Sequence, residues 1–403
     1  MNGGQRNYYH IYNRINKNDM KTLIDMSFVS PKTMHNSIPI LIFRFLGGVP
    51  KTERHKLKLL FDTGCAEQLH KLFPDYEYTT VNVRNIRKLY YDPRLLFAPF
   101  SLRTAINNSG CDAVFFPCDG NRFALFKFKI PSIVMINDLK WLKADTKSKQ
   151  KTLLSLIRSI LGRRKSYVTT IERASLITTN SEFTKKDLLQ FFPETDSSKV
   201  HAIHLSVPPI NGTHKPNGIT DNDKFILNVN TILQFKNLLT LLKAFVAIST
   251  QYNGNLVIVG RKTTYWNEVL IPFINENKLK DRVIRLENLE EEELRYLYEH
   301  ADVFVTPSLH EGFGFTPVEA GIYGCPVIST MCESLPEVTL GMVNYYEPPT
   351  DDTQLSRKLL EVLNNPPSKK ELSNISDTFK SKYSVENHAR NLLNLFDMIQ
   401  KKQ

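Results

Sequence analysis

Short apolar runs rich in β-branched residues alternate with stretches of helical periodicity along most of this chain of 403 residues. Such alternation is typical of α/β domains, in which helices flank a mostly parallel sheet. The candidate strands of the first half are 21–28, 58–62, 78–83, 112–116, 132–136, 174–179 and 200–204. Those of the second half are 224–230, 255–259, 282–286, 302–306, 326–329 and 342–345.

A polar stretch, 207–222, separates the two sets of strands. It is rich in Pro, Gly, Asn and Asp and has no apolar periodicity, which is typical of a linker. We therefore predict two doubly wound, Rossmann-like domains facing across a cleft, with ligands at the carboxyl ends of the strands. The predicted parts are an N-terminal extension (1–19), a first domain (20–206), the linker (207–222), a second domain (223–383) and a C-terminal helix (384–403). That helix has one apolar face and can dock on either domain.

Composition narrows the class of protein further. The five Cys residues form no C-x-x-C pair, which fits a reducing compartment better than a disulfide framework. The first residues lack the apolar core of a secretory signal, and the most apolar run, 38–43, is stopped by Arg44, far short of a membrane span. Residues 1–200 carry 32 Lys and Arg against 17 Asp and Glu, whereas the second half is slightly acidic. A basic half suits nucleic acid, an anionic lipid surface or a phosphorylated substrate, and charge alone does not separate these.

The densest chemical signal is the segment 302–337. A predicted strand runs into a turn with Gly312 and Gly314 and then into a helix that begins near Thr316. Free N–H groups at such a helix start suit a diphosphate. Two carboxylates flank this turn, Glu311 before it and Glu319 inside the helix, and such a pair can hold ribose on one side and a sugar on the other. The alternative is that Glu311 caps the helix and Glu319 lies on its solvated face.

The run from Glu311 to Ala320 resembles the Glu-x7-Glu motif of the family 4 retaining glycosyltransferases, which have the two-domain GT-B fold. The segment 225–245, with its Lys-Asn turn, resembles the strand, turn and helix of that family, and 334–338 (SLPEV) resembles the segment after its motif helix. In the first half, 136–139 (INDL) and 179–188 resemble two further family segments. The resemblance is strongest over 223–340.

The resemblance implies roles for several residues. Glu311 is expected to contact the hydroxyls of the donor sugar, and Glu319 the nucleotide ribose. Lys236 is expected to place a cation on the donor phosphates. Backbone contacts to sugar and diphosphate are expected from the turn residues Gly312, Phe313, Gly314, Phe315 and Thr316. Preorganised N–H groups and a Lys can stabilise the charge that grows on a departing phosphate, so no metal and no cofactor is required.

The chain departs from the family pattern at three positions. Phe235 and Thr231 stand where the family usually has an Arg, so the phosphate is held by Lys236 alone or with Arg261 after the next strand. Asn137 stands where the family has a His; an Asn amide donates and accepts hydrogen bonds but does not shuttle a proton. A retaining transfer in which the leaving phosphate takes the proton of the acceptor tolerates this change.

Other residues carry smaller expectations, and two of them lie on the acceptor side. Asp138 either holds a turn at a strand end or contacts acceptor, and Ser181 either caps the helix that follows or contacts acceptor. Trp141 can pack against an acceptor sugar, whereas Trp266 is expected in surface or interdomain packing. The cluster 221–223 (DND) resembles a metal-binding Asp-x-Asp but is expected to be a turn. The segment 147–165 is either a core-packed helix with a basic rim or a helix that lies in a membrane interface.

The sequence thus predicts a retaining, metal-independent hexosyltransferase with a GDP- or UDP-sugar donor and a glycan or polyprenyl-diphosphate-linked acceptor. Within the family, the chain looks most like mannosyltransferases of surface polysaccharide synthesis, of O-antigen or capsule type, at the inner face of the cytoplasmic membrane. The alternative is an inactive GT-B module that binds nucleotide sugars. Nucleic-acid binding is disfavoured, because the chain has no RRM, KH or zinc-finger motif. A dehydrogenase is disfavoured, because no third Gly follows Gly314 two residues later.

Overall fold

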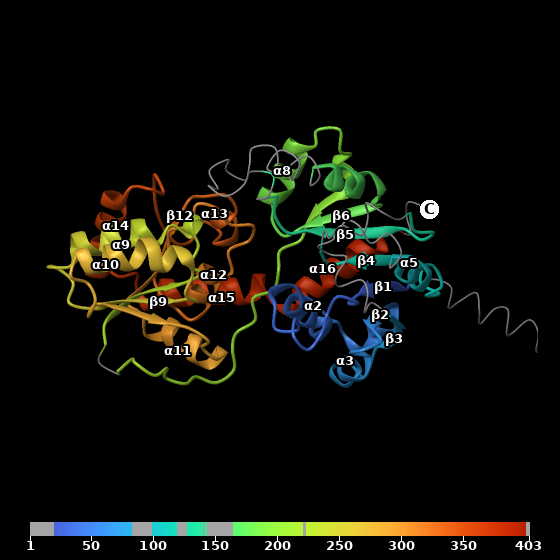
Figure 1. Ribbon diagram of the computed structural model, residues 1–403, viewed down its shortest axis with the longest axis horizontal. Helices are drawn as coiled ribbons and strands as arrows, with labels where there is room; N and C mark the ends of the chain where they lie inside the picture. Colours follow the sequence, from blue (N-terminus) through green and yellow to red (C-terminus); the bar gives the residue numbers. More distant parts are fainter. Residues whose placement is uncertain are drawn as a thin grey trace, which may run out of the picture. The chain divides into compact units, whose positions relative to one another are not determined.

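The computed structural model describes residues 20–82, 99–118, 127–139, 142, 164–220 and 223–399. The chain divides into two compact units. The first comprises the chain up to Asn180, Thr184–Ser206 and everything from Val385 onward, and the second comprises Val207–Ser384 with Ser181–Phe183. Each unit contains one parallel sheet with helices on both faces (Figure 1).

The first unit contains a seven-stranded sheet in the order β3-β2-β1-β4-β5-β6-β7, and every strand pair is parallel. Its strands are β1 (Thr22–Asp25), β2 (Leu57–Asp62), β3 (Glu77–Val81), β4 (Ala113–Phe116), β5 (Ser132–Ile136), β6 (Leu176–Thr179) and β7 (Val200–Ala202). Its helices are α2 (Ser37–Gly48), η1 (Lys51–Lys56), α3 (Ala66–Leu72), α5 (Pro99–Asn107), α8 (Glu182–Phe191), η2 (Ser197–Lys199) and α16 (Val385–Asp397), and residues 164–173 are also helical.

The second unit contains a six-stranded sheet in the order β10-β9-β8-β11-β12-β13, again parallel throughout. Its strands are β8 (Phe225–Val229), β9 (Asn255–Val259), β10 (Val283–Leu286), β11 (Val303–Thr306), β12 (Val327–Thr330) and β13 (Asn344–Tyr346). Its helices are η3 (Gln234–Lys236), α9 (Leu238–Ile248), η4 (Trp266–Leu270), α10 (Ile271–Glu276), α11 (Glu291–His300), α12 (Phe315–Ile322), α13 (Leu335–Val338), α14 (Asp352–Asn364) and α15 (Lys369–Lys382).

The strands predicted from the sequence are confirmed, with ends that move by one to three residues. The largest change is in the first strand, predicted over 21–28 and observed over Thr22–Asp25. It ends early because the N–H and the hydroxyl of Ser27 both donate to Oδ1 of Asp25, at 3.0 and 2.7 Å. A carboxylate that accepts a hydrogen bond from the backbone N–H two residues later forms a turn, so the strand ends at Asp25.

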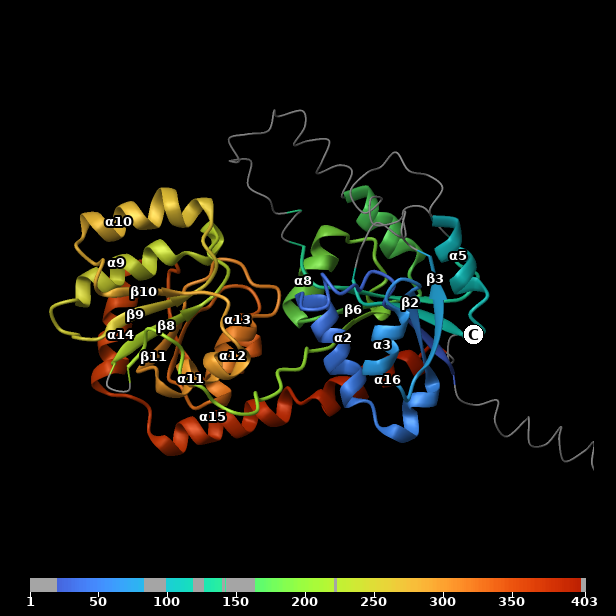
Figure 2. The ribbon, with the colours of Figure 1, turned by 60° about the horizontal axis from the view of Figure 1, so that its bottom comes forward.

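Both faces of the second sheet are covered by apolar helix surfaces. Helices α9, α10 and α14 pack on one face, where Phe245, Ile274 and Leu359 join one core cluster. Helices α11 and α12 pack on the other face, where Leu297 and Ala320 join a second cluster (Figure 2). Trp266 lies in the first cluster with only 3% of its surface exposed, so the expectation of surface or interdomain packing is wrong. The guanidinium carbon of Arg285 lies 5.7 Å from the centroid of its ring.

The stretch expected to be a linker packs along the second unit. The N–H of His214 donates to the carbonyl of Glu292 at 3.1 Å, and Ile219 is buried in the core cluster of α11 and α12. The C-terminal helix α16 packs against α2 of the first unit, where Phe396 contacts Phe45 and Phe115 at ring-centroid distances of 6.1 and 5.2 Å. Within the described ranges, no helix is both long and apolar enough to cross a bilayer.

Candidate active site

The order of the second sheet fixes where a ligand can bind. The chain passes from β8 to β9 on one side, whereas β11 lies on the other side of β8. The carboxyl ends of β8 and β11 are therefore neighbours at a switch point, which is where ligands bind in doubly wound sheets. The loop after β8 carries Lys236, and the loop after β11 carries Glu311 and the Gly-rich turn.

The Lys-Asn turn after β8 is held by the side chain of Asn237. This residue adopts the left-handed conformation, with φ 57° and ψ 33°, which Asn tolerates better than most residues. Its amide donates to the carbonyls of Pro307 at 3.1 Å and Pro349 at 2.8 Å. The N–H of Leu309 also donates to the carbonyl of Phe235 at 2.8 Å. These bonds join the loop after β8 to the loop after β11 and place Lys236 opposite Glu311.

Lys236 and Glu311 form an ion pair, with Nζ and Oε1 2.6 Å apart. Only 13% of the Lys side chain and 12% of the Glu side chain are exposed to solvent. A pair this well buried is strongly coupled, because removing one partner leaves an uncompensated charge in a poorly solvated place. The two residues that the sequence assigned to phosphate and to sugar are thus in direct contact.

The loop that carries Glu311 is anchored by the segment after β12. The hydroxyl of Ser334 donates to the carbonyls of Glu311 and Phe313, both at 2.9 Å. The carboxylate of Glu333 accepts the N–H of Glu311 at 2.7 Å and lies 3.1 Å from Nδ1 of His310. Glu333 itself has φ 53°, a conformation uncommon in residues other than Gly. The backbone of the Glu311 turn is therefore fixed on both sides before any ligand binds.

Helix α12 begins directly after this turn. Gly314 is its N-cap residue, with φ 94° and ψ 68°, and a Cβ at this position would lie 2.8 Å from Cδ2 of Leu335. Among the described residues, no side chain caps the helix, so Glu311 is not its cap and the first-turn N–H groups of Phe315 and Thr316 are available. These N–H groups, at the positive end of the helix dipole, form a site suited to an anion.

Glu319 lies one turn further along α12 and is half-buried. Its Oε2 accepts a hydrogen bond from the hydroxyl of Tyr298 at 2.9 Å. Tyr298 is only 1% exposed, and burial raises the pKa of its phenol well above the usual value, with the Glu319 carboxylate adding to the effect. The carboxylate is thus oriented by a Tyr that stays a donor, and the solvated-face alternative for Glu319 is wrong.

The positions where the chain departs from the family pattern hold no second cation near Lys236. Phe235 places its ring centroid 5.5 Å from Nζ of Lys236, and Thr231 is exposed. Arg261 follows β9 and is exposed, with no hydrogen-bond or ion-pair partner among the described residues. It lies at the same edge of the sheet as Lys236, one strand away, because β9 pairs with β8. Gly260 lets the ends of these two strands approach closely.

The remaining candidates lie at the ends of two strands of the first sheet. Asn137 directly follows β5, and its amide oxygen is buried with no hydrogen-bond partner among the described residues. The next residue, Asp138, is half-buried, and its backbone carbonyl accepts from the hydroxyl of Tyr167 at 3.4 Å. Ser181 is buried between β6 and α8. Trp141 and most of 147–165 lie outside the described residues.

Sequence reasoning missed several residues that shape these sites. Tyr298 orients the carboxylate of Glu319, Glu333 holds the backbone N–H of Glu311, and Asn237 fixes the turn beside Lys236. Of these, only the left-handed tendency of Asn237 was a local signal. Asp25 is a further case: it ends β1 at the switch point of the first sheet, fully buried, and burial raises its pKa to about 6. No group of three His, Cys, Asp or Glu is placed to hold a metal in the described ranges, which exclude Asp221.

Comparison with known proteins agrees with this architecture. Residues 210–378 match the family model "Glycosyl transferases group 1". An O-antigen chain mannosyltransferase of Salmonella typhimurium, RfbU, is 31% identical over 41% of this chain and 45% of its own length. An uncharacterized glycosyltransferase of Methanocaldococcus jannaschii is 28% identical over 44% of this chain and 47% of its own length. These matches span about half the length of the curated relatives.

The fold has close counterparts among solved structures. HepE from Anabaena, in complex with UDP, has a TM-score of 0.68 and 14% identity, covering 94% of this chain and 100% of that one. Sucrose-phosphate synthase from Thermosynechococcus elongatus has a TM-score of 0.66 and 14% identity over 95% of this chain and 100% of that one. The predicted fold class, a GT-B protein with two Rossmann-like parallel-sheet domains, is confirmed. So is the resemblance to glycosyltransferases, and to mannosyltransferases among them.

Proposed function

We propose that this protein is a retaining hexosyltransferase that uses a nucleotide diphosphate sugar as donor. The observation that carries the proposal is the Lys236–Glu311 pair, which lies at the switch point of the second sheet beside the uncapped start of α12. A buried cation, available N–H groups and two carboxylates within one loop and helix match the parts of such a donor: diphosphate, sugar and ribose. The solved complex of HepE with UDP-glucose supports a nucleotide-sugar ligand for this fold.

The chemistry assigned to each group follows from its position. When the bond between the sugar C1 and the phosphate oxygen breaks, negative charge grows on the leaving phosphate. Lys236 and the N–H groups of Phe315 and Thr316 are fixed before binding, so they stabilise that charge with little reorganisation. Glu311 accepts hydrogen bonds from sugar hydroxyls, and Glu319 accepts them from the ribose. Backbone contacts from Gly312, Phe313 and Gly314 complete the donor site, and Arg261 adds a cation near the nucleotide.

The acceptor side is assigned to residues that follow β5 and β6 of the first sheet. Asn137 offers its amide to the reacting sugar, and the buried oxygen without a partner is a group that a sugar hydroxyl would satisfy. Asp138 and Ser181 are assigned to the acceptor. Since an Asn amide does not take up or release a proton at neutral pH, the leaving phosphate takes the proton of the acceptor hydroxyl. The proposed reaction needs no metal and no cofactor.

The sugar and the acceptor are proposed from the relatives. Two O-antigen chain mannosyltransferases are among them, so we propose mannose from a GDP- or UDP-sugar and a glycan or lipid-linked saccharide acceptor in surface polysaccharide synthesis. The basic first half, with 32 Lys and Arg against 17 Asp and Glu in residues 1–200, would hold the protein at an anionic membrane face.

The test is a turnover assay with purified protein, a panel of nucleotide sugars and a lipid-linked saccharide acceptor. We expect release of one nucleoside diphosphate and a product whose new linkage keeps the anomeric configuration of the donor. Lys236→Met should abolish most of the turnover, whereas Lys243→Met, at an exposed Lys of α9, should leave it unchanged. An inverted linkage would contradict the retaining assignment.

The second candidate is an inactive GT-B module that binds nucleotide sugars. Asn137, Phe235 and Thr231, which stand where the family has His and Arg, favour it. The same assay separates the two: a pure binding module takes up the nucleotide sugar, as calorimetry would show, but releases no nucleoside diphosphate with any acceptor.

A further inference from the structure

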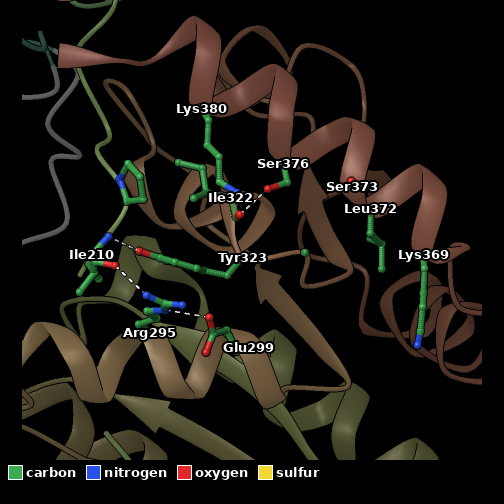
Figure 3. A pocket seen from close by; sticks show the side chains of 12 residues that line it. Ile210, Arg295, Glu299, Ile322, Tyr323, Lys369, Leu372, Ser373, Ser376 and Lys380 are labelled. Carbon is green, nitrogen blue, oxygen red and sulfur yellow. Dashed lines mark hydrogen bonds and ion pairs between the residues drawn. The ribbon is translucent and has the colours of Figure 1, made fainter. Parts of the chain in front are cut away.

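A cavity lies in the second unit, on the face of the sheet that carries α11, α12 and α15 (Figure 3). Its volume is about 420 Å³, within the range of small-molecule sites. One wall is the face of α15 that includes Leu372, Ser373 and Ser376, and the floor is the end of α12 with Tyr323. The cavity does not include Lys236, Glu311 or Glu319, so it is distinct from the candidate donor site.

Beside the cavity, α15 packs closely on α12. A Cβ on Gly321 would lie 2.6 Å from the ring of Phe379, so α15 sits directly on the backbone of α12 there. The hydroxyl of Ser376 donates to the carbonyl of Ile322, which fixes the rotation of α15. A Cβ on Gly324, in contrast, would meet no atom within 4 Å. The packing of Phe379 on Gly321 and the hydrogen bond of Ser376 therefore hold α12 and α15 together. The cavity lies beside this contact, where Gly324 leaves space.

The lining is positively charged. Arg295 is held by three contacts: Nε donates to Glu299 at 2.7 Å, Nη1 donates to the carbonyl of Ile210 at 3.0 Å, and the guanidinium lies 5.6 Å from the ring centroid of Tyr323. Lys369 and Lys380 lie at the two ends of the lining face of α15, and Figure 3 shows Lys380 extending toward Ile322. Among the described residues, neither Lys forms a hydrogen bond or an ion pair.

These charges leave an excess of cations that no protein group neutralises. The single lining carboxylate, Glu299, is already paired with Arg295, and the two Lys residues remain. Between them stand the hydroxyls of Ser373 and Ser376 and the apolar side chains of Ile210 and Leu372. A Lys binds a phosphate through its single charged ammonium, and an Arg binds it through two parallel N–H donors. Ser hydroxyls form hydrogen bonds with the hydroxyls of a ligand.

We propose that this cavity binds a small phosphate monoester with a hydroxylated body, of the hexose phosphate class. The phosphate is held by Lys380 at one end of the lining face of α15, and the body lies over Leu372 beside the hydroxyl of Ser373. This inference does not depend on the proposed function, because it rests on residues outside the donor site.

The test uses the full chain, glucose 6-phosphate as probe, and titration calorimetry. We expect binding at sub-millimolar concentration, roughly tenfold or more weaker in Lys369→Gln/Lys380→Gln, since this double variant removes the charge-assisted bond of Lys380 to the phosphate and the cation at the other end of the lining face. Lys370→Gln/Lys243→Gln removes two exposed cations outside the cavity and should change the affinity by less than about twofold. Ser373→Phe fills the cavity without changing its charge and should abolish binding.

Three comparisons can overturn the proposal. Glucose and inorganic phosphate should each bind at least about fivefold more weakly than glucose 6-phosphate, because each lacks one half of the recognised group. Equal binding of inorganic phosphate would remove the hexose phosphate class. Loss of binding in the control double variant would show diffuse charge attraction, and displacement of the probe by saturating GDP or UDP would place it in the donor site. Nucleotide-sugar binding, measured separately, shows whether the donor site itself is functional.

Discussion

The contact between Lys236 and Glu311 makes an unusual prediction about nucleotide affinity. In the free protein the ammonium is neutralised by the carboxylate 2.6 Å away. A phosphate that binds Lys236 on its other side lies roughly 5 Å from that carboxylate, and with an effective dielectric constant of 20–40 the repulsion is about 2–3 kcal/mol. Glu311→Gln removes this repulsion and keeps an oxygen that accepts from Lys236. GDP or UDP should therefore bind at least about 1 kcal/mol more tightly, roughly fivefold.

Lys236→Met should act in the opposite direction. It removes a charge-assisted bond to phosphate and leaves Glu311 unpaired, so nucleoside diphosphate affinity should fall by about 2 kcal/mol, roughly thirtyfold. The assay is calorimetric titration of the bare nucleoside diphosphate, which lacks the sugar that Glu311 is assigned to hold. Glu268→Gln, at an exposed position of η4, is the charge control and should bind like the natural sequence. If Glu311→Gln weakens binding as much as Lys236→Met does, the phosphate does not bind at Lys236 and the reasoning is refuted.

Three further predictions concern stability and site geometry. Gly314→Ala should lower the free energy of unfolding by about 1–3 kcal/mol and weaken nucleotide binding, since φ is 94° and the new Cβ meets Leu335; unchanged thermal unfolding would contradict this. Tyr298→Phe keeps the ring but removes the bond to Glu319, so chemical denaturation should show a loss of about 1 kcal/mol, and no loss would show that the bond contributes nothing. His388 is buried, with its pKa lowered to about 4, so its neutral form is favoured in the fold. The unfolded chain then binds more protons between pH 4 and pH 6.5, so stability falls as the pH falls. The loss of unfolding free energy between pH 7 and pH 5 should be about 2 kcal/mol larger than in His388→Leu. Equal losses in the two proteins, measured by urea denaturation at both pH values, would exclude this.

The fold could be predicted because its signal is local. Buried parallel strands are short, apolar and β-branched, so their positions are visible in the sequence as runs such as 255–259. Packing of single large side chains is not local. Trp266 was expected in surface or interdomain packing, yet it is buried in the core cluster that α9, α10 and α14 form on one face of the sheet. Nothing within a few residues of Trp266 carries that information.

The candidate site shows the same limit. Glu311, Lys236 and the Gly-rich turn stand out by residue type and by their order relative to strands. Their mutual contact does not, because it joins positions 75 residues apart and depends on Asn237 adopting a left-handed conformation. The anchors Ser334 and Glu333 act through backbone groups of the Glu311 turn, and a hydrogen bond to backbone leaves no pattern in the partner's sequence.

The most direct test of the central claim is calorimetric binding of UDP-, GDP-, ADP- and dTDP-sugars, without added metal, to the natural sequence, to Glu319→Ala and to the control Glu268→Ala. The account predicts micromolar binding of one nucleotide class, weakened by about 1–3 kcal/mol in Glu319→Ala and unchanged in the control. Absence of binding across the panel, or equal affinity in Glu319→Ala, would contradict the assignment of the donor site to the loop after β11 and helix α12.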